Sequence, residues 1–217
     1  MFKDRQQAGR LLAEKLSGFA AANPVVYALP RGGLPIAEEI ARRLNAPLDL
    51  ILVRKLGAPG HEELAMGALV DGAAPTTILH DDVIAELAVP ESYIEHSKAA
   101  ALREIERRRK LYMKDRPAIS PQGRTVIIAD DGLATGATME AAVAAMRKAK
   151  AGRIVVAVPV APDDTVQALR HKADDVIVLQ KPNPFWSVGS WYESFPQLAD
   201  EDVIATLERT YAAQAAP

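Results

Sequence analysis

The chain has 217 residues, of which 49% are hydrophobic and 25% are charged, and its formal net charge is −2. This length and composition suffice for one well-buried domain, and the near-neutral charge argues against a protein whose main task is to wrap nucleic acid. Because the sequence contains no cysteine, it can form neither a disulfide nor a thiolate metal site, and it has no cysteine nucleophile.

The sequence also shows no feature of export or membrane insertion. Met1 leads directly into a charged amphipathic segment, and no run of about 18 apolar residues follows anywhere. We therefore expect a cytoplasmic protein without a membrane partner. We expect residues 1–217 to form a single domain with its core at about residues 20–180.

Helical and strand patterns alternate along the chain. The predicted helices cover residues 6–22, 34–44, 91–113, 137–150, 163–171 and 200–212, and the predicted strands cover residues 25–29, 48–53, 125–129, 153–158 and 175–179. Strands that alternate with helices favour parallel pairing with right-handed crossovers. The sequence therefore predicts an α/β fold of the Rossmann-like kind, with a parallel five-stranded sheet flanked by helices.

Two segments lack clear periodicity. Residues 54–75 contain several residues that interrupt regular secondary structure, namely Gly57, Pro59, Gly60, Gly67 and Gly72. We interpret this segment as a long mobile loop with room for a short hairpin, and long loops in compact domains are commonly functional. The second segment, residues 181–196, is dense in proline, glycine and aromatic residues, and we expect it to be irregular.

The most informative stretch joins the strand at 125–129 to the helix that begins near 137. After Asp130 and Asp131, this turn is rich in small and hydroxyl residues. Free N–H groups at a helix start attract anions, and glycine lets a backbone approach a ligand closely. The turn therefore resembles a phosphate cradle, formed by Ala134, Thr135, Gly136, Ala137 and Thr138.

The two acids at the strand end need a different partner, because they would repel a phosphate. Asp130 and Asp131 make better sense facing sugar hydroxyls or a divalent cation. The stretch therefore predicts a ligand that carries both a phosphate and a polyol. The alternative is an ordinary strand-to-helix turn capped by an aspartate.

An apolar strand, two acids and a Thr-Gly-Ala-Thr turn resemble the phosphoribosyl diphosphate (PRPP) signature of type I phosphoribosyltransferases. The resemblance implies transfer of a 5-phosphoribosyl group from PRPP to a nitrogenous base, as in nucleobase salvage, with release of diphosphate. It further implies a homodimer and a Mg²⁺ cofactor held mainly by PRPP, with Asp130 and Asp131 as candidate ligands.

Two other strand-end loops fit this resemblance. Pro30-Arg31-Gly32-Gly33 supplies a cation and two glycines where the family has its pyrophosphate loop. The family loop often contains a non-proline cis peptide, which we expect at Pro30-Arg31 or Arg31-Gly32. Arg54 and Lys55 resemble the pair that precedes the catalytic flexible loop of adenine and orotate enzymes, and either charge could neutralise the departing diphosphate. The alternatives are a glycine-rich turn with a solvated arginine at residues 30–33 and a solvated strand end with two exposed cations at Arg54-Lys55.

Residues 181–196 resemble the hood of purine phosphoribosyltransferases, the segment that covers the base. The spacing around Gly189 then places Trp186, Val188 and Glu193 at the base. The alternative is that the aromatic residues pack the last helix onto the core. Where 6-oxopurine enzymes carry an acid, this chain has Ala134, which disfavours hypoxanthine or guanine as acceptor. Glu62, Glu63 and Glu193 are open candidates for a general base.

The helix at 91–113 carries a basic run that includes Arg107, Arg108 and Arg109, with Glu104 and Glu106 between the cations. We interpret it as a solvated face with ion pairs three and four residues apart, so nucleic acid is not the expected partner. The run remains the best surface for RNA. Two alternative functions therefore stay open: a PRPP- or nucleotide-sensing regulator that binds RNA, and a non-catalytic phosphate binder.

Overall fold

The computed structural model describes residues 1–72, 75–114 and 116–215, without the side chains of residues 62–63 and 214–215. Its central sheet has five parallel strands and confirms the predicted α/β fold. In spatial order they are β2 (Leu48–Leu50), β1 (Val25–Ala28), β6 (Thr125–Ala129), β7 (Arg153–Val160) and β8 (Asp175–Gln180).

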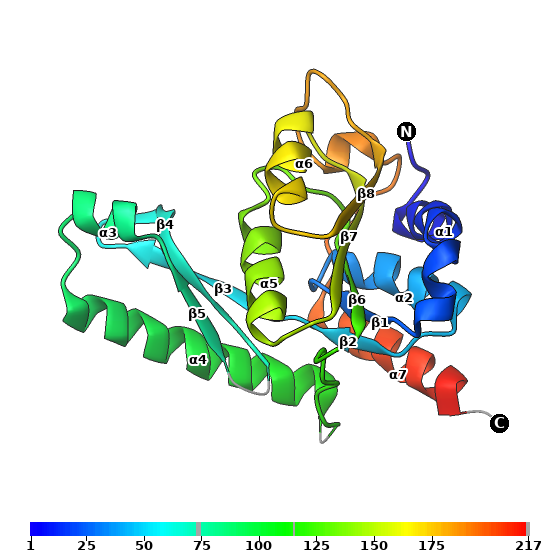
Figure 1. The fold of residues 1–217 in the computed structure, drawn as a ribbon, viewed down its shortest axis with the longest axis horizontal. Helices are drawn as coiled ribbons and strands as arrows, with labels where there is room; N and C mark the ends of the chain where they lie inside the picture. Colours follow the sequence, from blue (N-terminus) through cyan, green and yellow to red (C-terminus); the bar gives the residue numbers. More distant parts are fainter. Residues whose placement is uncertain (73–74, 115, 216–217) are drawn as a thin grey trace.

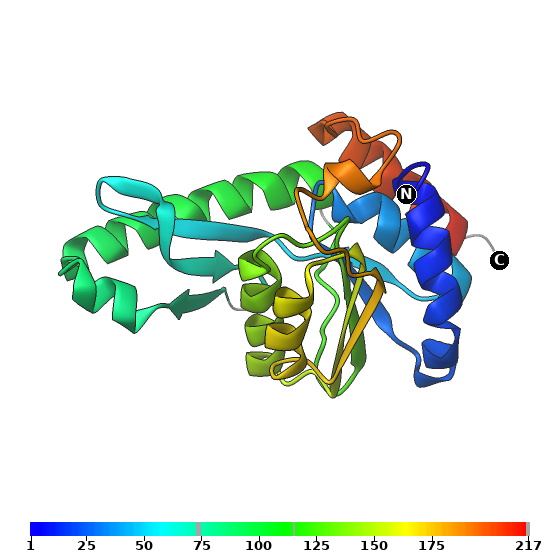
Figure 2. The ribbon, with the colours of Figure 1, turned by 90° about the horizontal axis from the view of Figure 1, so that it is seen from above.

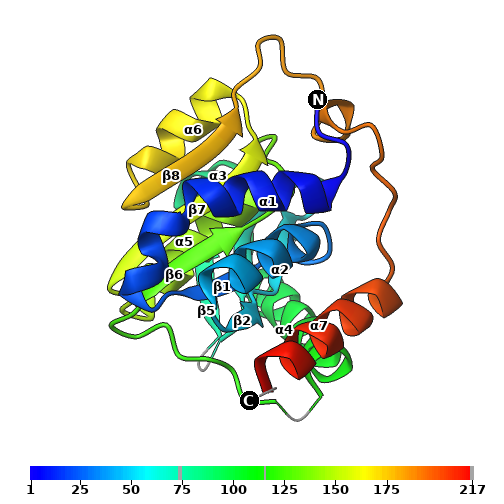
Figure 3. The same ribbon diagram turned by 90° about the vertical axis from the view of Figure 1, so that its right-hand side faces the viewer.

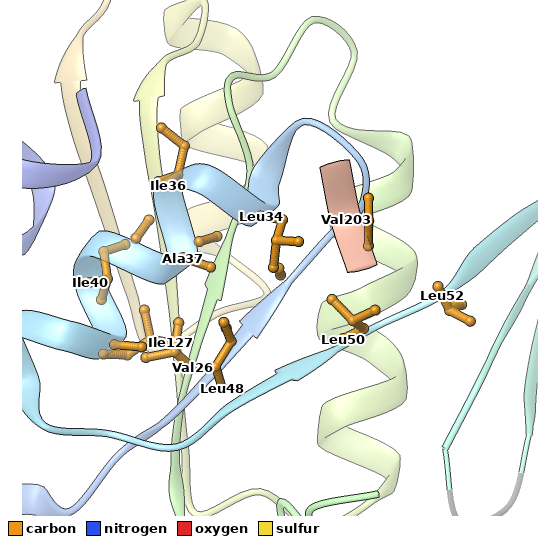
Figure 4. Close-up of a cluster of buried hydrophobic side chains, with 14 of the residues drawn as sticks. Val26, Leu34, Ile36, Ala37, Ile40, Leu48, Leu50, Leu52, Ile127 and Val203 are labelled. Atoms are coloured by element: carbon orange, nitrogen blue, oxygen red, sulfur yellow. The ribbon is translucent and has the colours of Figure 1, made fainter. Parts of the chain in front are cut away.

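Helices cover both faces of this sheet (Figures 1 and 3). One face carries α1 (Arg5–Lys15) and α2 (Gly33–Leu44), and the other carries α5 (Ala137–Lys148) and α6 (Asp163–Arg170). Alternate residues of a strand point to opposite faces, so Val26 and Ile127 meet α2 (Figure 4), while Val126 and Ile128 lie in the second apolar cluster, with residues of α5. Strands β1, β2, β6 and β7 are therefore largely buried, whereas β8 at the edge of the sheet is only partly buried.

The helix predicted over 6–22 is shorter than expected. It ends at Lys15, and a 3-10 helix, η1 (Ser17–Ala22), follows it up to Asn23. Ser17 and Gly18 are weak helix formers, which accounts for the break. At the far end of the chain, α7 (Asp200–Ala215) packs on α2 and α4 (Glu91–Met113), and the irregular segment before it contains only a short 3-10 helix, η2 (Gly189–Trp191).

The prediction of a long loop over residues 54–75 is wrong, although the hairpin for which it left room is present. Residues 54–58 and 61–70 belong to an antiparallel sheet of three strands, β3 (Val53–Ala58), β4 (His61–Val70) and β5 (Thr76–Leu79). The β3–β4 hairpin turns at Pro59-Gly60, where Gly60 has φ +72°, and its apolar side chains pack on α4. The many glycines obscure the alternation of apolar and polar residues that would indicate strands. In addition, the helix that buries the hairpin, α4, begins about 20 residues later in the chain.

Together, β3, β4, β5, α3 (Asp81–Glu86) and α4 form an arm, residues 53–113, that projects from the core (Figures 1 and 2). The chain leaves the central sheet after Leu50, and β3 begins at Val53, so the strand predicted over 48–53 divides between core and arm. None of the helices in the described part of the chain is both long and apolar enough to cross a bilayer.

Ion pairs on α4 agree only in part with the predicted solvated face. Arg107 and Arg108 both contact Glu104 as expected. Arg109 instead turns inward, with its side chain 22% exposed, and pairs with Asp49 and Asp71. Both carboxylates are almost fully buried, and burial raises the pKa of Asp71 to about 6 while Arg109 opposes this rise.

Arg109 therefore connects the arm to the core. Asp49 lies in β2 and also accepts hydrogen bonds from Leu50 N and Ile119 N, while Asp71 accepts one from Leu52 N. The two acids thus fix the point at which the chain passes from the central sheet into the arm.

Replacing Arg109 by alanine should destabilise the protein by about 3–5 kcal/mol, because it leaves two buried carboxylates without their cation. Arg107→Ala, which removes an exposed pair of the same helix, should cost far less, because solvent screens that pair. Urea unfolding of both variants measures the difference, and equal costs would contradict the anchoring role of Arg109.

Candidate functional site

A pocket opens at the carboxyl ends of β1 and β6, where ligands bind in open parallel sheets. Its volume is about 470 Å³, and it is lined by the loop after β1, the two acids after β6, residues 195–198, Arg5 and Val188. We call it the acidic pocket. Figure 3 shows the N-terminus and the segment that follows β8 beside this end of the sheet.

The loop after β1 and the turn after β6 are in direct contact. A Cβ atom on Gly32 would lie 2.1 Å from Asp131 Oδ2, and one on Gly33 would lie 2.5 Å from the carbonyl oxygen of Ala129. Only glycine fits at either position without displacing its neighbour. The peptide bond between Pro30 and Arg31 is cis, as expected.

The two acids occupy different electrostatic environments. Asp131 Oδ2 accepts a hydrogen bond of 2.8 Å from Arg5 Nε, and Asp130 Oδ1 accepts one from the backbone N–H of Asp131. Burial raises the pKa of the Asp130 carboxyl well above its usual range, and the neighbouring Asp131 adds to the rise. Burial also raises the pKa of Asp131, but Arg5 opposes this effect. Arg5 is therefore the cation that offsets the charge of the acid pair.

The predicted phosphate cradle forms the turn into α5. Gly136 is left-handed, with φ +76°, and the first intrahelical bond runs from Glu140 N to the Gly136 carbonyl. The N–H groups earlier in the turn are therefore the ones that can bind an anion. Thr165 holds the turn from α6, because its hydroxyl donates a 2.7 Å hydrogen bond to the Ala134 carbonyl. Ala134 and Thr135 are exposed, while Ala137 and Thr138 are half-buried.

The three residues predicted to meet a base lie in different places. Val188 lines the acidic pocket and packs over Gly132. Trp186 is 79% exposed and lines a second pocket of about 540 Å³ beside Lys181 and Trp191. Glu193 is exposed and is not among the residues that line either pocket.

The other aromatic residues of this segment pack against the core, as the alternative expected, but the ring contacts of Tyr192 are with the N-terminal segment and with Phe195 and not with the last helix. Tyr192 is buried between Phe2 and Phe195, with ring centroids 5.4 Å and 4.9 Å away. Its hydroxyl donates a 2.6 Å hydrogen bond to the Asp131 carbonyl. Tyr192 therefore supports the site through the main chain of the second acid.

Arg54 and Lys55 lie on β3 of the arm, and both are exposed. Because neighbouring strand residues point to opposite faces, the two side chains lie on opposite faces of the β3–β4 hairpin. Lys55 pairs with Ala68, which is buried among residues of α5, whereas Arg54 pairs with Leu69, which is buried in the cluster that includes residues of α4. Lys55 is therefore on the side of α5.

Of the remaining predicted residues, Arg31 lines the acidic pocket and its Nη1 lies 3.5 Å from Asp200 Oδ1. Asp200 also accepts a hydrogen bond of 2.6 Å from the Tyr112 hydroxyl, so it links the first loop to α4. The side chains of Glu62 and Glu63, the two other candidates for a general base, lie outside the described part of the structure.

A divalent cation would find only part of a coordination shell here. The described residues contain no group of three histidine, cysteine or acidic side chains that could hold a metal. One or two carboxylates fit Mg²⁺ when substrate phosphates supply the other oxygens. Asp130 and Asp131 therefore fit a Mg²⁺ that a diphosphate ligand carries, but not a metal site built from protein alone.

Comparison with known proteins decides the family. The model of the phosphoribosyl transferase domain matches residues 3–194. The chain belongs to the phosphoribosyl transferase family. The family match confirms the resemblance drawn from the strand, the two acids and the Thr-Gly-Ala-Thr turn.

The relatives cover nearly all of this chain. It is 41% identical over 211 residues to two Mycobacterium tuberculosis proteins, "Putative phosphoribosyl transferase MT0597" and "Putative phosphoribosyl transferase Rv0571c". These alignments cover 97% of this chain and 47% of each relative, so the chain spans about half the length of the curated relatives that it matches. The crystal structure of TT1426 from Thermus thermophilus is similar at a TM-score of 0.85 and 42% identity, over 96% of this chain and 98% of that one.

Arg5, Thr165 and Tyr192, which support this candidate site, escaped sequence reasoning, as did residues 195–198, which line the acidic pocket. Each reaches the site from a distant part of the chain, and Arg5 is 126 positions away from Asp131. No local pattern marks such a residue, because its role depends on how the helices and the segment after β8 pack around the sheet.

Gly32→Ala should destabilise the protein by about 1–3 kcal/mol, since the new methyl group would overlap the Asp131 carboxylate. Gly18→Ala is the matched control: Gly18 is exposed, and a Cβ there would meet nothing within 4 Å. Denaturant unfolding of the two variants compares them. If both are equally stable, the predicted close approach of Gly32 to Asp131 is wrong.

Proposed function

We propose that this phosphoribosyl transferase moves the 5-phosphoribosyl group of PRPP onto a nitrogenous base and releases diphosphate. The observation that carries the proposal is the contact between Gly32 and Asp131 at the open end of the sheet. This contact places three parts at one edge of the sheet: the loop at residues 30–33 with its arginine, the acid pair Asp130 and Asp131, and the start of α5. A phosphorylated pentose with a diphosphate presents the matching groups.

Each part of the site has a role in this reaction. Residues 134–138 bind the 5′-phosphate, Asp130 and Asp131 accept hydrogen bonds from the ribose hydroxyls, and Arg31 with Gly32 and Gly33 binds the diphosphate. As the bond between the anomeric carbon and diphosphate breaks, positive charge builds on the ribose ring. The carboxylates beside the ring stabilise that charge, and Arg31 stabilises the negative charge on the leaving group.

Mg²⁺ is the proposed cofactor. When bound, it neutralises charge on the diphosphate and supports its departure. Asp130 and Asp131 would contact it or the ribose hydroxyls that share it. Before the ligand binds, Asp200, which is itself held by Tyr112, keeps the Arg31 guanidinium in place through their 3.5 Å contact. When the diphosphate binds, Arg31 would exchange this contact for one with the diphosphate.

The acceptor is proposed only as a class, a nucleobase or a similar nitrogenous base, with salvage as the role. Ala134 supplies no acid where 6-oxopurine enzymes have one, and the exposed Glu193 lines neither of the two pockets at this end of the sheet. Arg107, Arg108 and Arg109 of the basic run on α4 pair with Glu104, Asp49 and Asp71, which disfavours an RNA-binding function. We further propose one phosphoribosyl transferase domain over residues 1–217 and a homodimer, as the family resemblance implies.

The test is diphosphate release from PRPP and Mg²⁺ in the presence of a panel of nucleobases. We expect base-dependent release by the native protein and at least about tenfold weaker PRPP binding by Asp131→Asn, because an amide is a poorer acceptor for ribose hydroxyls. Calorimetry measures the affinity. Native affinity in Asp131→Asn would contradict the role of this carboxylate, and the absence of both release and PRPP binding would refute the proposed function.

Removing Lys55 or Arg54 tests which of the two cations stabilises the departing diphosphate. Because Lys55 is on the side of α5, Lys55→Ala should lower kcat by about tenfold or more while the KM for PRPP stays within about twofold. Arg54→Ala, one residue earlier on the opposite face of β3, should leave both constants within about twofold. A larger loss in Arg54→Ala would show that the role belongs to Arg54 and not to Lys55.

A further inference from the structure

Arg5 is the first residue of α1, and its side chain is only 9% exposed. Its guanidinium is held from three sides. Nε donates to Asp131 Oδ2 at 2.8 Å, Nη1 donates to the Pro196 carbonyl at 2.8 Å, and Cζ lies 3.7 Å from the centre of the Phe195 ring. A side chain fixed in this way has little freedom to move, so the position of its charge is well defined.

The surroundings of Arg5 form a brace around Asp131. Phe2 N donates to the Trp191 carbonyl and Glu193 N donates to the Phe2 carbonyl, which ties the N-terminal segment to the segment after β8. Tyr192, which follows Trp191, donates its hydroxyl to the main chain of Asp131. The second acid therefore receives one contact at its side chain and one at its backbone from this brace, while Gly32 lies directly against its carboxylate.

We propose that Arg5 is a positioning residue for ribose recognition: its guanidinium fixes the Asp131 carboxylate and offsets the charge of the acid pair, so that a phosphorylated pentose can bind. The inference rests on the proposed function. Arg5 itself need not touch the sugar. It contacts only one carboxylate oxygen, Oδ2, so Oδ1 remains to accept a ribose hydroxyl.

Charge explains why a cation is needed at this place. Two adjacent carboxylates repel each other and also repel the phosphate groups of the ligand. Arg31 is the other cation that lines the acidic pocket, and its ion pair is with Asp200 and not with the acid pair. Arg5 therefore supplies the only ion pair that reaches Asp130 or Asp131 among the described residues. An arginine suits the position better than a lysine, because its planar fork reaches the carboxylate and the Pro196 carbonyl together.

The experiment measures binding of ribose 5-phosphate and of inorganic diphosphate by calorimetry, with Mg²⁺ present. Arg5→Ala should bind ribose 5-phosphate at least about tenfold more weakly than the native protein, with diphosphate affinity changed by less than about threefold. Arg5→Lys, which keeps the charge, should recover part of the loss and replaces the alanine variant if that variant does not fold. Arg10→Ala, from an exposed residue of the same helix, should match the native protein.

A double-variant comparison separates positioning from a general structural effect. If Arg5 acts through Asp131, then adding Arg5→Ala to Asp131→Asn should change ribose 5-phosphate affinity by less than about threefold. Additive losses in the double variant, equal losses for both ligands, or tighter sugar binding by Arg5→Ala would each overturn the inference. Native protein that binds neither PRPP nor ribose 5-phosphate would refute the proposed function as well, whereas native binding with unchanged affinity in the Arg5 variants would refute the Arg5 inference alone.

Discussion

The structure of the site depends on burying two neighbouring carboxylates at the open end of a parallel sheet. Burial and mutual repulsion raise the pKa of Asp130, so the pair needs a cation and hydrogen-bond donors close by. Arg5 supplies the cation, and the backbone N–H of Asp131 supplies a donor. The residue facing the Asp131 carboxylate must in turn be a glycine, because any side chain at position 32 would occupy the space of Oδ2.

The same constraint accounts for where the N-terminal segment and the segment after β8 pack. The N-terminal segment and residues 189–197 are joined by backbone hydrogen bonds and by the packing of Tyr192 between Phe2 and Phe195. Both segments contact Asp131, the first through the side chain of Arg5 and the second through the hydroxyl of Tyr192. The segment that the family resemblance assigns to base binding is thus also a structural support for the sugar end of the site, whereas Trp186 stays exposed outside that packing.

The arm is attached by the same kind of interaction that supports the site, an arginine that is at least partly buried and pairs with buried or partly buried acids. Arg109 pairs with Asp49 at the edge of the central sheet and with Asp71 at the end of β4. Asp200, near the first loop, contacts Tyr112 of the same helix. The helix α4 is therefore linked both to the core sheet and to the loop that carries Arg31.

The sequence alone determined the local units: five apolar strands, the helices between them and the strand, acids and turn at 125–138. These are visible because strand burial and helix capping depend on neighbouring residues. That the loop at 30–33 and the two acids share one edge of the sheet also followed, since parallel strands end at the same edge. Tertiary structure decided the rest. The hairpin of residues 53–70 needs α4 to bury it, Arg109 turns inward only because two distant acids meet there, and Arg5 and Thr165 reach the site by packing across the chain, which no local pattern records.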